Sequence, residues 1–147
     1  MINLNVFSEE KAWSKKLKKK DFFFKSICDA FPKKYKFLNK KISLSLLLSN
    51  NKKIKILNKK FRKKNTHTDI LSFPFRQKIK NIKEIYLGDI IISINKIKNK
   101  KDKKNIDDQL KKLFIHGLTH LLGYRHEKDK EFYVMNKVEK TFYNYMK

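Results

Sequence analysis

The chain has 147 residues, of which 40% are apolar and 13% aromatic, so it can bury the core of a folded domain and is not a disordered composition. Its single cysteine, Cys28, excludes an intramolecular disulfide, and its longest apolar runs are far too short to span a bilayer. The length fits one domain, over residues 1–147. The N-terminus lacks the pattern of a signal peptide, so we expect the protein in the cytoplasm.

The formal net charge of +24 is concentrated in the first 104 residues, because residues 105–147 carry 8 basic and 6 acidic side chains. Such an excess of positive charge indicates a polyanionic partner, most simply a nucleic acid. However, only three of the 38 basic residues are arginine, and a lysine excess beside many Asn and Ile residues also fits a compositional bias of the whole genome. The charge alone therefore leaves both interpretations open.

The spacing of apolar residues predicts an alternation of strands and helices. Four strands are expected, at residues 2–7, 42–48, 70–75 and 86–94. About five helices are expected: four at residues 8–31, 50–61, 105–122 and 129–145, and one that begins at Ile94 and is followed by a lysine-rich loop up to Lys104. The predicted N-caps are Ser8, Asn50 or Asn51, and Asn105 or Asp107. This order implies an α+β fold, in which a single small, mixed, four-stranded sheet is packed with about five helices.

Several inner positions of the helices follow from the same spacing. Phe61 is expected on the inner face of the second helix with Ile54 and Leu57, and Phe132 on one side of the last helix with Met135, Val138 and Phe142.

Three of the four histidines lie in one stretch, HGLTHLLGYRH at residues 116–126. His116 and His120 are one helical turn apart, which places their Cβ atoms about 5–6 Å from each other. Gly123 should end the helix, because glycine tolerates the left-handed conformation of a helix C-terminus, and His126 can then return to the same ion. Three neutral imidazoles suit one Zn²⁺ ion with an open fourth position, although imidazole also suits nickel and copper.

The same histidine spacing occurs in metzincin peptidases. Those enzymes carry a glutamate directly after the first histidine as the general base, whereas this chain has Gly117 there. A metal-dependent peptidase is therefore the weaker interpretation of the site.

Further motifs resemble the YbeY family of bacterial endoribonucleases that mature ribosomal RNA. The histidine stretch has the family's glycine after the first histidine, which is more specific than a generic three-histidine pattern. The remaining matches are LNKKFR at residues 57–62, TDILSFPF at 68–75, LGD at 87–89, and Met135 and Glu139. In order along the chain, they cover most of the expected domain.

The resemblance implies a zinc-dependent, single-strand-specific endoribonuclease that acts in 16S rRNA 3′-end maturation, rRNA processing and ribosome quality control. It implies that His116, His120 and His126 hold one zinc ion and that Arg62 is the catalytic residue of the cleft. The implied partners are single-stranded RNA, chiefly rRNA, and the ribosome or its small subunit, with no DNA or membrane expected. The alternative is a non-catalytic ribosome-assembly factor with a zinc site and a basic rRNA-binding face, against which the three ligands argue, because structural zinc sites usually have four.

Arg62 also stands out by residue type in a chain that uses lysine almost everywhere. A guanidinium offers a planar fork of donors that can bind a phosphate through two hydrogen bonds, which lysine cannot do. The other interpretation is an arginine that caps carbonyl groups at a helix end.

The chain departs from similar proteins at two positions. Arg125 stands where they usually have Asp, so any role in orienting a histidine ligand must be filled elsewhere or be absent. His67 stands where they tend to have Pro, and we expect it to be a loop histidine that faces solvent rather than a fourth ligand. Asp69 and Asp89, at predicted strand ends, are candidates for polar support of the site, although capping or turn hydrogen bonds are the simpler expectation.

Overall fold

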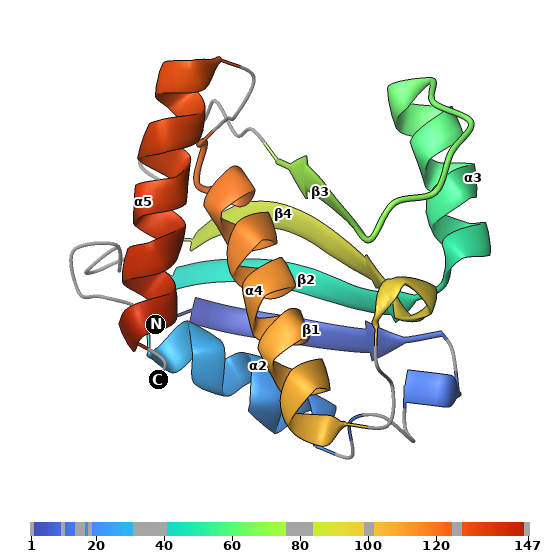
Figure 1. Cartoon of the computed structure of the whole chain (residues 1–147), viewed down its shortest axis with the longest axis horizontal. Coiled ribbons are helices and arrows are strands. Elements are labelled where there is room, and N and C mark those ends of the chain that lie inside the picture. The colour runs from blue at the N-terminus through green and yellow to red at the C-terminus, as the bar shows by residue number, and fades with distance from the viewer. Residues whose placement is uncertain are drawn as a thin grey trace.

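A computed structural model of the chain describes residues 2–9, 11–13, 17, 19–30, 41–75, 84–98, 102–124 and 128–145. The elements in these residues are β1 (Ile2–Ser8), α2 (Lys20–Asp29), β2 (Lys41–Ser49), α3 (Asn51–Arg62), β3 (Ile70–Pro74), β4 (Glu84–Ser93), the 3₁₀ helix η2 (Ile94–Lys96), α4 (Lys103–Leu121) and α5 (Asp129–Tyr145). The α+β class is confirmed (Figure 1), and the described part of the chain has four α-helices instead of the five or so that we expected.

The four strands form one mixed sheet in the order β1-β2-β4-β3. β1 and β4 both run parallel to β2, whereas β3 runs antiparallel to β4 and forms one edge of the sheet. Each predicted strand lies within two residues of its observed bounds. The sequence pattern is reliable here because buried and half-buried side chains alternate along most of β2, as strand geometry requires.

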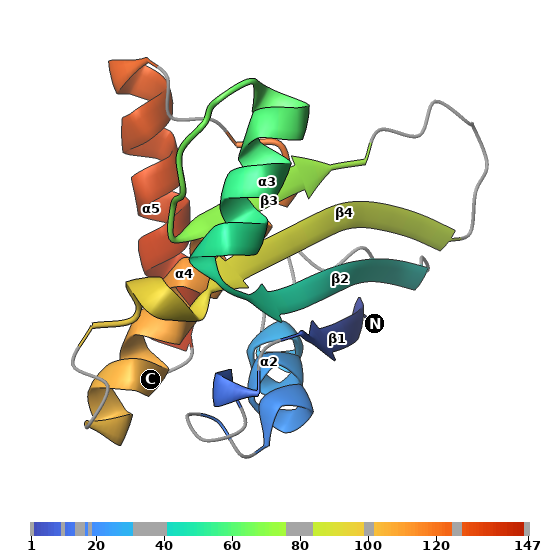
Figure 2. The same cartoon turned by 90° about the vertical axis from the view of Figure 1, so that its right-hand side faces the viewer.

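The two faces of the sheet carry different helices. Most of the core lies on one face, where α2, α4 and α5 pack against side chains such as Leu44, Leu46 and Ile90. In Figure 1 α4 crosses in front of the strands, and Figure 2 shows α2 beneath β1. α3 packs on the opposite face, where Ile54 contacts the smaller cluster that contains Leu71 and Ile91.

The predicted helix at residues 8–31 is wrong at its start. Ser8 is the last residue of β1, where it still pairs with β2, and α2 begins only at Lys20. The fully buried Trp13 lies in between, and its indole N–H donates to the carbonyl of Ser49, at 2.9 Å. This bond holds the segment at the end of β2, so it does not join α2 as one straight helix. The predicted end, Phe31, lies outside the described residues.

α3 begins as predicted, with the side chain of Asn50 accepting a hydrogen bond from the amide of Lys53 at 2.9 Å. Its predicted inner face is wrong at Phe61, which is 59% exposed. The last turns of α3 bury Asn58 instead, whose side-chain amide donates to the carbonyl of Thr66 at 3.0 Å. The end of the helix therefore packs on the loop that follows it.

Two other helix predictions need correction. The helix predicted from Ile94 is the short η2, followed by residues 97–98 without regular structure, but α4 starts with Asp102 as its N-cap in place of Asn105 or Asp107. The bounds of α5 are as predicted, but Phe132 is 58% exposed, because the buried face of that helix starts one turn later. Across the described residues, no helix is both long and apolar enough to cross a membrane.

Candidate metal centre and active-site cleft

α4 brings His116 and His120 together as predicted. Their Nε2 atoms are 3.1 Å apart, and the two rings are nearly perpendicular, with centroids at 4.6 Å. Nδ1 of His116 lies 2.7 Å from Oε1 of Glu139 on α5, and Nδ1 of His120 lies 3.1 Å from the carbonyl oxygen of Tyr124. A carboxylate and a carbonyl only accept hydrogen bonds, so each Nδ1 carries the ring proton.

This arrangement fits a metal ion. With the ring protons on Nδ1, the Nε2 atom of each histidine can offer its lone pair to one metal ion between the two rings. Two nitrogen ligands at the usual zinc distance of about 2.0–2.1 Å lie roughly 3.3 Å apart in a tetrahedral site. The observed 3.1 Å is close to that separation.

The third predicted ligand, His126, lies outside the described residues, as does Arg125. In the described ranges there is no group of three His, Cys, Asp or Glu side chains that could hold a metal ion. His67 is exposed in the loop after α3, as expected for a histidine that faces solvent. The structure therefore joins two of the three predicted ligands, and the complete three-histidine site remains a prediction.

Glu139 and the Tyr124 carbonyl orient the two histidines, a role that Arg125 could not fill. Groups of this kind fix the ring orientation and raise the basicity of a metal-binding imidazole. The motif resemblance singled out Glu139 but gave it no contact, since it lies 23 residues from His116 in the sequence. The role of Tyr124 depends on its backbone carbonyl, so no side-chain pattern could have predicted it.

Both glycines of the histidine stretch have structural roles. Gly123 has a φ of +103° and ends the helix as predicted. A Cβ on Gly117 would lie 3.0 Å from Ile70 and 3.1 Å from Ile90, so α4 passes closely over the sheet at this point. A glutamate here would have to displace apolar side chains of the core, which argues further against the peptidase interpretation.

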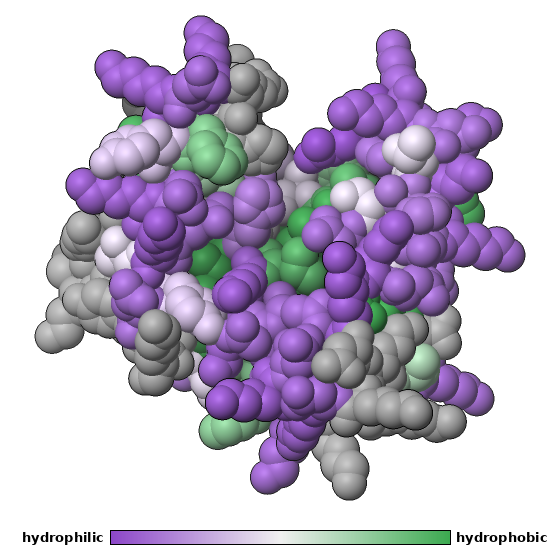
Figure 3. Space-filling view, viewed as in Figure 1, coloured by the Kyte–Doolittle hydropathy of each residue, from purple (hydrophilic) through white to green (hydrophobic). Residues whose placement is uncertain are grey.

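The histidine pair opens into a cleft of about 530 Å³. It is lined by Arg62, Thr68, Asp69, Ile70, Ser72, Pro74, Phe75, His116, His120, Leu121, Leu122, Gly123 and Tyr124. Figure 3 shows the hollow between the side of the molecule formed by α4 and α5 and the side formed by α3. β3 connects the two sides, since its neighbours are the end of α3 and the C-terminal part of α4.

Arg62 lies on the wall of the same cleft as the histidines. Its Nη2 donates to the carbonyl of Ser72 at 2.8 Å, and its guanidinium lies 5.6 Å from the ring centroid of Phe73. The carbonyl that it binds belongs to β3, not to its own helix. The interpretation of Arg62 as a cap of its own helix is therefore wrong.

The two candidate aspartates have different positions. Asp69 lines the cleft, where its side chain accepts a hydrogen bond from the Thr68 hydroxyl at 3.3 Å. Asp89 was expected at a strand end but lies inside β4, where it accepts a hydrogen bond from the Tyr86 hydroxyl and is not part of the cleft wall. Burial and the bond to Asp89 raise the pKa of Tyr86 above its ordinary value. Of the two, only Asp69 is placed to support the cleft.

Comparison with known proteins identifies the chain as a member of a family of RNA-cleaving enzymes. A family model described as "Endoribonuclease YbeY" matches residues 6–147. The chain is 51% identical to the Endoribonuclease YbeY of Pelagibacter ubique, over 100% of this chain and 97% of that protein. It is 36% identical to that of Ehrlichia canis, over 95% of this chain and 88% of that protein. The chain belongs to the YbeY family, as its motifs predicted.

A solved structure supports the fold. The solution structure of a Thermotoga maritima protein is similar, with a TM-score of 0.57 and 26% sequence identity, over 97% of this chain and 87% of that protein. The likeness extends over nearly the whole chain, so the overall fold is shared with a second protein.

Proposed function

We propose that this protein is a zinc-dependent, single-strand-specific endoribonuclease of the cytoplasm. Its proposed roles are maturation of the 16S rRNA 3′ end, rRNA processing and ribosome quality control, with the ribosome or its small subunit as partner. The naming of its relatives as endoribonucleases supports RNA cleavage. The observation that carries the proposal is the approach of two Nε2 atoms to 3.1 Å, with both Nδ1 atoms facing oxygen acceptors, in a cleft that also contains Arg62.

His116, His120 and His126 are the proposed zinc ligands. A zinc ion held there would supply a Lewis acid that activates water and polarises a phosphoryl oxygen at neutral pH. Glu139 and the Tyr124 carbonyl keep the proton of each described histidine on Nδ1, so that Nε2 can bind the metal.

Arg62 is the proposed catalytic residue. A guanidinium has five N–H donors, so the bond to Ser72 can hold the side chain in place while other donors bind the phosphate. Charge that develops on the phosphate during cleavage would then be stabilised by a group that is already oriented. Stacking on Phe73 further limits the movement of this side chain.

The test compares the protein with its Arg62→Glu and His120→Ala variants. Bound metal is quantified in each, and each is incubated with a single-stranded rRNA fragment at moderate salt. We expect one zinc per chain in the parent and in Arg62→Glu, loss of zinc from His120→Ala, and cleavage by the parent alone. The ends of the products then identify the nucleophile, because attack by the RNA 2′-hydroxyl leaves a 2′,3′-cyclic phosphate and attack by water does not.

Equal cleavage by all three proteins would mean that a contaminating nuclease is responsible. The non-catalytic assembly factor would then be the better interpretation, with the +24 charge serving rRNA binding. Zinc retained at full stoichiometry in both His116→Ala and His120→Ala would refute the proposed metal site.

A further inference from the structure

A second hollow lies on the opposite face of the sheet, which α3 covers only in part. Its volume is about 520 Å³, and it is lined by residues of β1, β2, β3, β4 and α3. Ser45, Asp89 and Phe73, which are paired with one another across β2, β4 and β3, lie on its floor. The hollow is distinct from the catalytic cleft, which lies on the α4 side of β3.

Exposed phenylalanine side chains converge on this hollow. Phe7 from β1 and Phe61 from α3 are 58% and 59% exposed and both line it. Phe61 also packs edge-on against Phe73, with ring centroids at 5.6 Å. A single exposed apolar side chain is ordinary on a protein surface, but rings from separate elements that meet at one hollow indicate a binding site.

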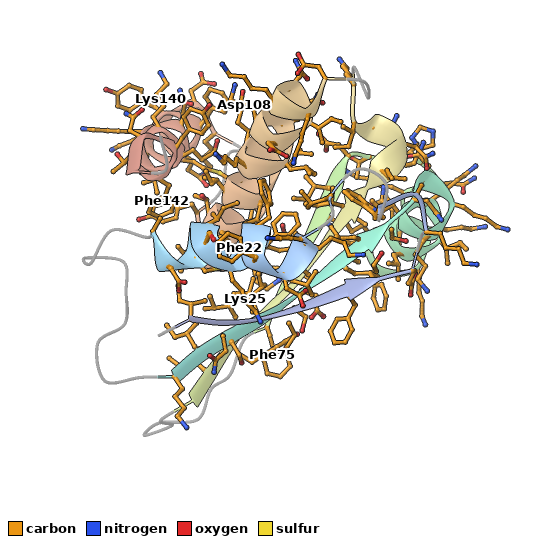
Figure 4. The ribbon with its side chains drawn as sticks, turned by 90° about the horizontal axis from the view of Figure 1, so that it is seen from below. Phe22, Lys25, Phe75, Asp108, Lys140 and Phe142 are labelled. Atoms are coloured by element: carbon orange, nitrogen blue, oxygen red, sulfur yellow. The ribbon has the colours of Figure 1, made fainter. Side chains whose placement is uncertain are left out.

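Phe75 links the hollow to the cleft. It is 54% exposed, lines the cleft, and packs at 5.8 Å against Tyr86, whose hydroxyl bonds to Ser45 and Asp89 on the floor of the hollow. In Figure 4 Phe75 lies on the side of the strands away from α4 and α5. A chain-like ligand could therefore contact both sites at once.

The helix beside the hollow is strongly basic. α3 and the two residues after it contain no acidic side chain and eight basic ones: Lys52, Lys53, Lys55, Lys59, Lys60, Arg62, Lys63 and Lys64. Lys60 lies 5.3 Å from the ring centroid of Phe61. Lys53 lines the hollow and Arg62 lines the cleft, so a polyanion that follows α3 from one to the other would arrive at the proposed catalytic residue.

Two carboxylates lie in the hollow itself and decide which part of a nucleic acid fits there. Glu9 is paired with Lys53 at 4.0 Å, and Asp89 is bonded to Tyr86. Carboxylates repel phosphates, but they accept hydrogen bonds from the amino groups of bases. The hollow therefore suits bases, while the phosphates suit α3.

We propose that this hollow binds the bases of single-stranded RNA, stacked on Phe7 and Phe61, while the phosphates follow α3 into the cleft. The proposal rests on the proposed function and adds the path that the strand takes beyond the cleaved bond. Aromatic rings beside a basic groove are the usual means of binding single strands without strict sequence preference. A second copy of the chain is a poor occupant, because it would bring two copies of the basic α3 close together.

The experiment uses Phe7→Leu and Phe61→Leu, which keep an apolar side chain but remove the flat ring. Phe22→Leu is the matched control, because Phe22 is 71% exposed on α2, on the other face of the sheet (Figure 4). Binding is measured by fluorescence anisotropy at fixed salt, with the metal removed by a chelator so that no cleavage occurs. The probes are a short oligoadenylate and an abasic phosphodiester of the same length.

Each Leu variant at the hollow should bind oligoadenylate roughly fivefold to a hundredfold more weakly, as expected for the loss of one base–aromatic stack. Affinity for the abasic strand should not change, and the Phe22→Leu control should bind both probes like the parent. Phe61→Trp, which restores a flat ring, should bind oligoadenylate at least as tightly as the parent.

Three results would overturn the inference: oligoadenylate affinity unchanged in both Leu variants, an equal loss on the abasic strand, or a parent dimer in sedimentation that Phe61→Leu dissociates. The first would leave a protein as the better occupant of the hollow. Because the assay involves no cleavage, the two proposals can fail separately. A parent that binds as expected but does not cleave RNA refutes only the proposed function, and one that cleaves RNA while both variants bind normally refutes only this inference.

Discussion

Replacement of Glu139 tests whether a carboxylate on α5 sets the metal affinity of the histidine pair. Its Oε1 is 2.7 Å from Nδ1 of His116, and the two side chains are 26% and 34% exposed. A charged hydrogen bond contributes about 1.5–3 kcal/mol and a neutral one about 0.5–1.5 kcal/mol. Glu139→Gln keeps an acceptor but loses the charge, and partial exposure favours the lower values, so we expect a loss of about 1 kcal/mol, or about fivefold in zinc affinity.

Glu139→Ala should lose more, because it leaves the Nδ1 proton of His116 without this acceptor. Loss of a group that orients a metal ligand typically weakens binding by about 10- to 100-fold. The assay is competition for zinc with a chromophoric chelator near neutral pH and at constant ionic strength. Glu131→Gln, on the first turn of α5, is the control for the same change of charge.

We expect the parent and Glu131→Gln to bind zinc equally tightly, Glu139→Gln to bind it more weakly, and Glu139→Ala to bind it most weakly. If both Glu139 variants bind zinc like the parent, the hydrogen bond to His116 does not stabilise the metal site. If Glu131→Gln loses as much as Glu139→Gln, the effect comes from net charge and not from the contact.

Three further predictions concern Arg62, Gly88 and Cys28. Arg62→Lys should bind zinc like the parent but lose most RNA cleavage, because an ammonium group lacks the forked donors of a guanidinium. Cleavage at the parent rate would mean that two parallel hydrogen bonds from Arg62 to the phosphate are not needed. Gly88→Ala should lower the free energy of unfolding, measured in urea, by roughly 2–4 kcal/mol, because φ is +138° and a Cβ would lie 2.2 Å from the carbonyl oxygen of Phe73. A free energy of unfolding equal to that of the parent within error would contradict this prediction. Burial raises the pKa of the Cys28 thiol from 9.0 to about 12, so alkylation should require unfolding. The thiol of the unfolded chain loses its proton at a lower pH than the buried thiol. The free energy of unfolding should therefore fall as the pH rises between those two values, and Cys28→Ala should make this dependence on pH weaker.

The sequence predicted the elements whose signals are local. Alternation in the strands and the cap at Asn50 depend on neighbouring residues, and both are confirmed. The first helix was wrong because the position of Trp13 is set by the carbonyl of Ser49, 36 residues away. Phe61 and Phe132 have helical spacing but are exposed. The spacing of apolar residues places them on one face of a helix, but it does not show whether another element packs on that face.

In the candidate site, too, the sequence predicted the local features but not the contacts between distant residues. The placement of His116 and His120 side by side on α4 follows from helix geometry, and the sequence predicted it. The contact between Glu139 and His116 depends on how α5 packs against α4, which no local pattern specifies. Asp89 looked equivalent to Asp69 in the sequence, but the sheet places it on the opposite face from the histidines.

The edge strand β3 gives the cleft unequal walls. In the described part of the chain it pairs with β4 alone, over five residues, and the bond from Arg62 to Ser72 lies on its outer side. The wall formed by α4 is packed into the main core, whereas the other wall depends on the pairing of this short strand, so we expect it to open more easily. Amide protons of β3 should therefore exchange with solvent earlier than those of β2. An RNA strand that contacts both Arg62 and the histidine pair would slow that exchange, because its binding would stabilise the pairing of β3 with β4.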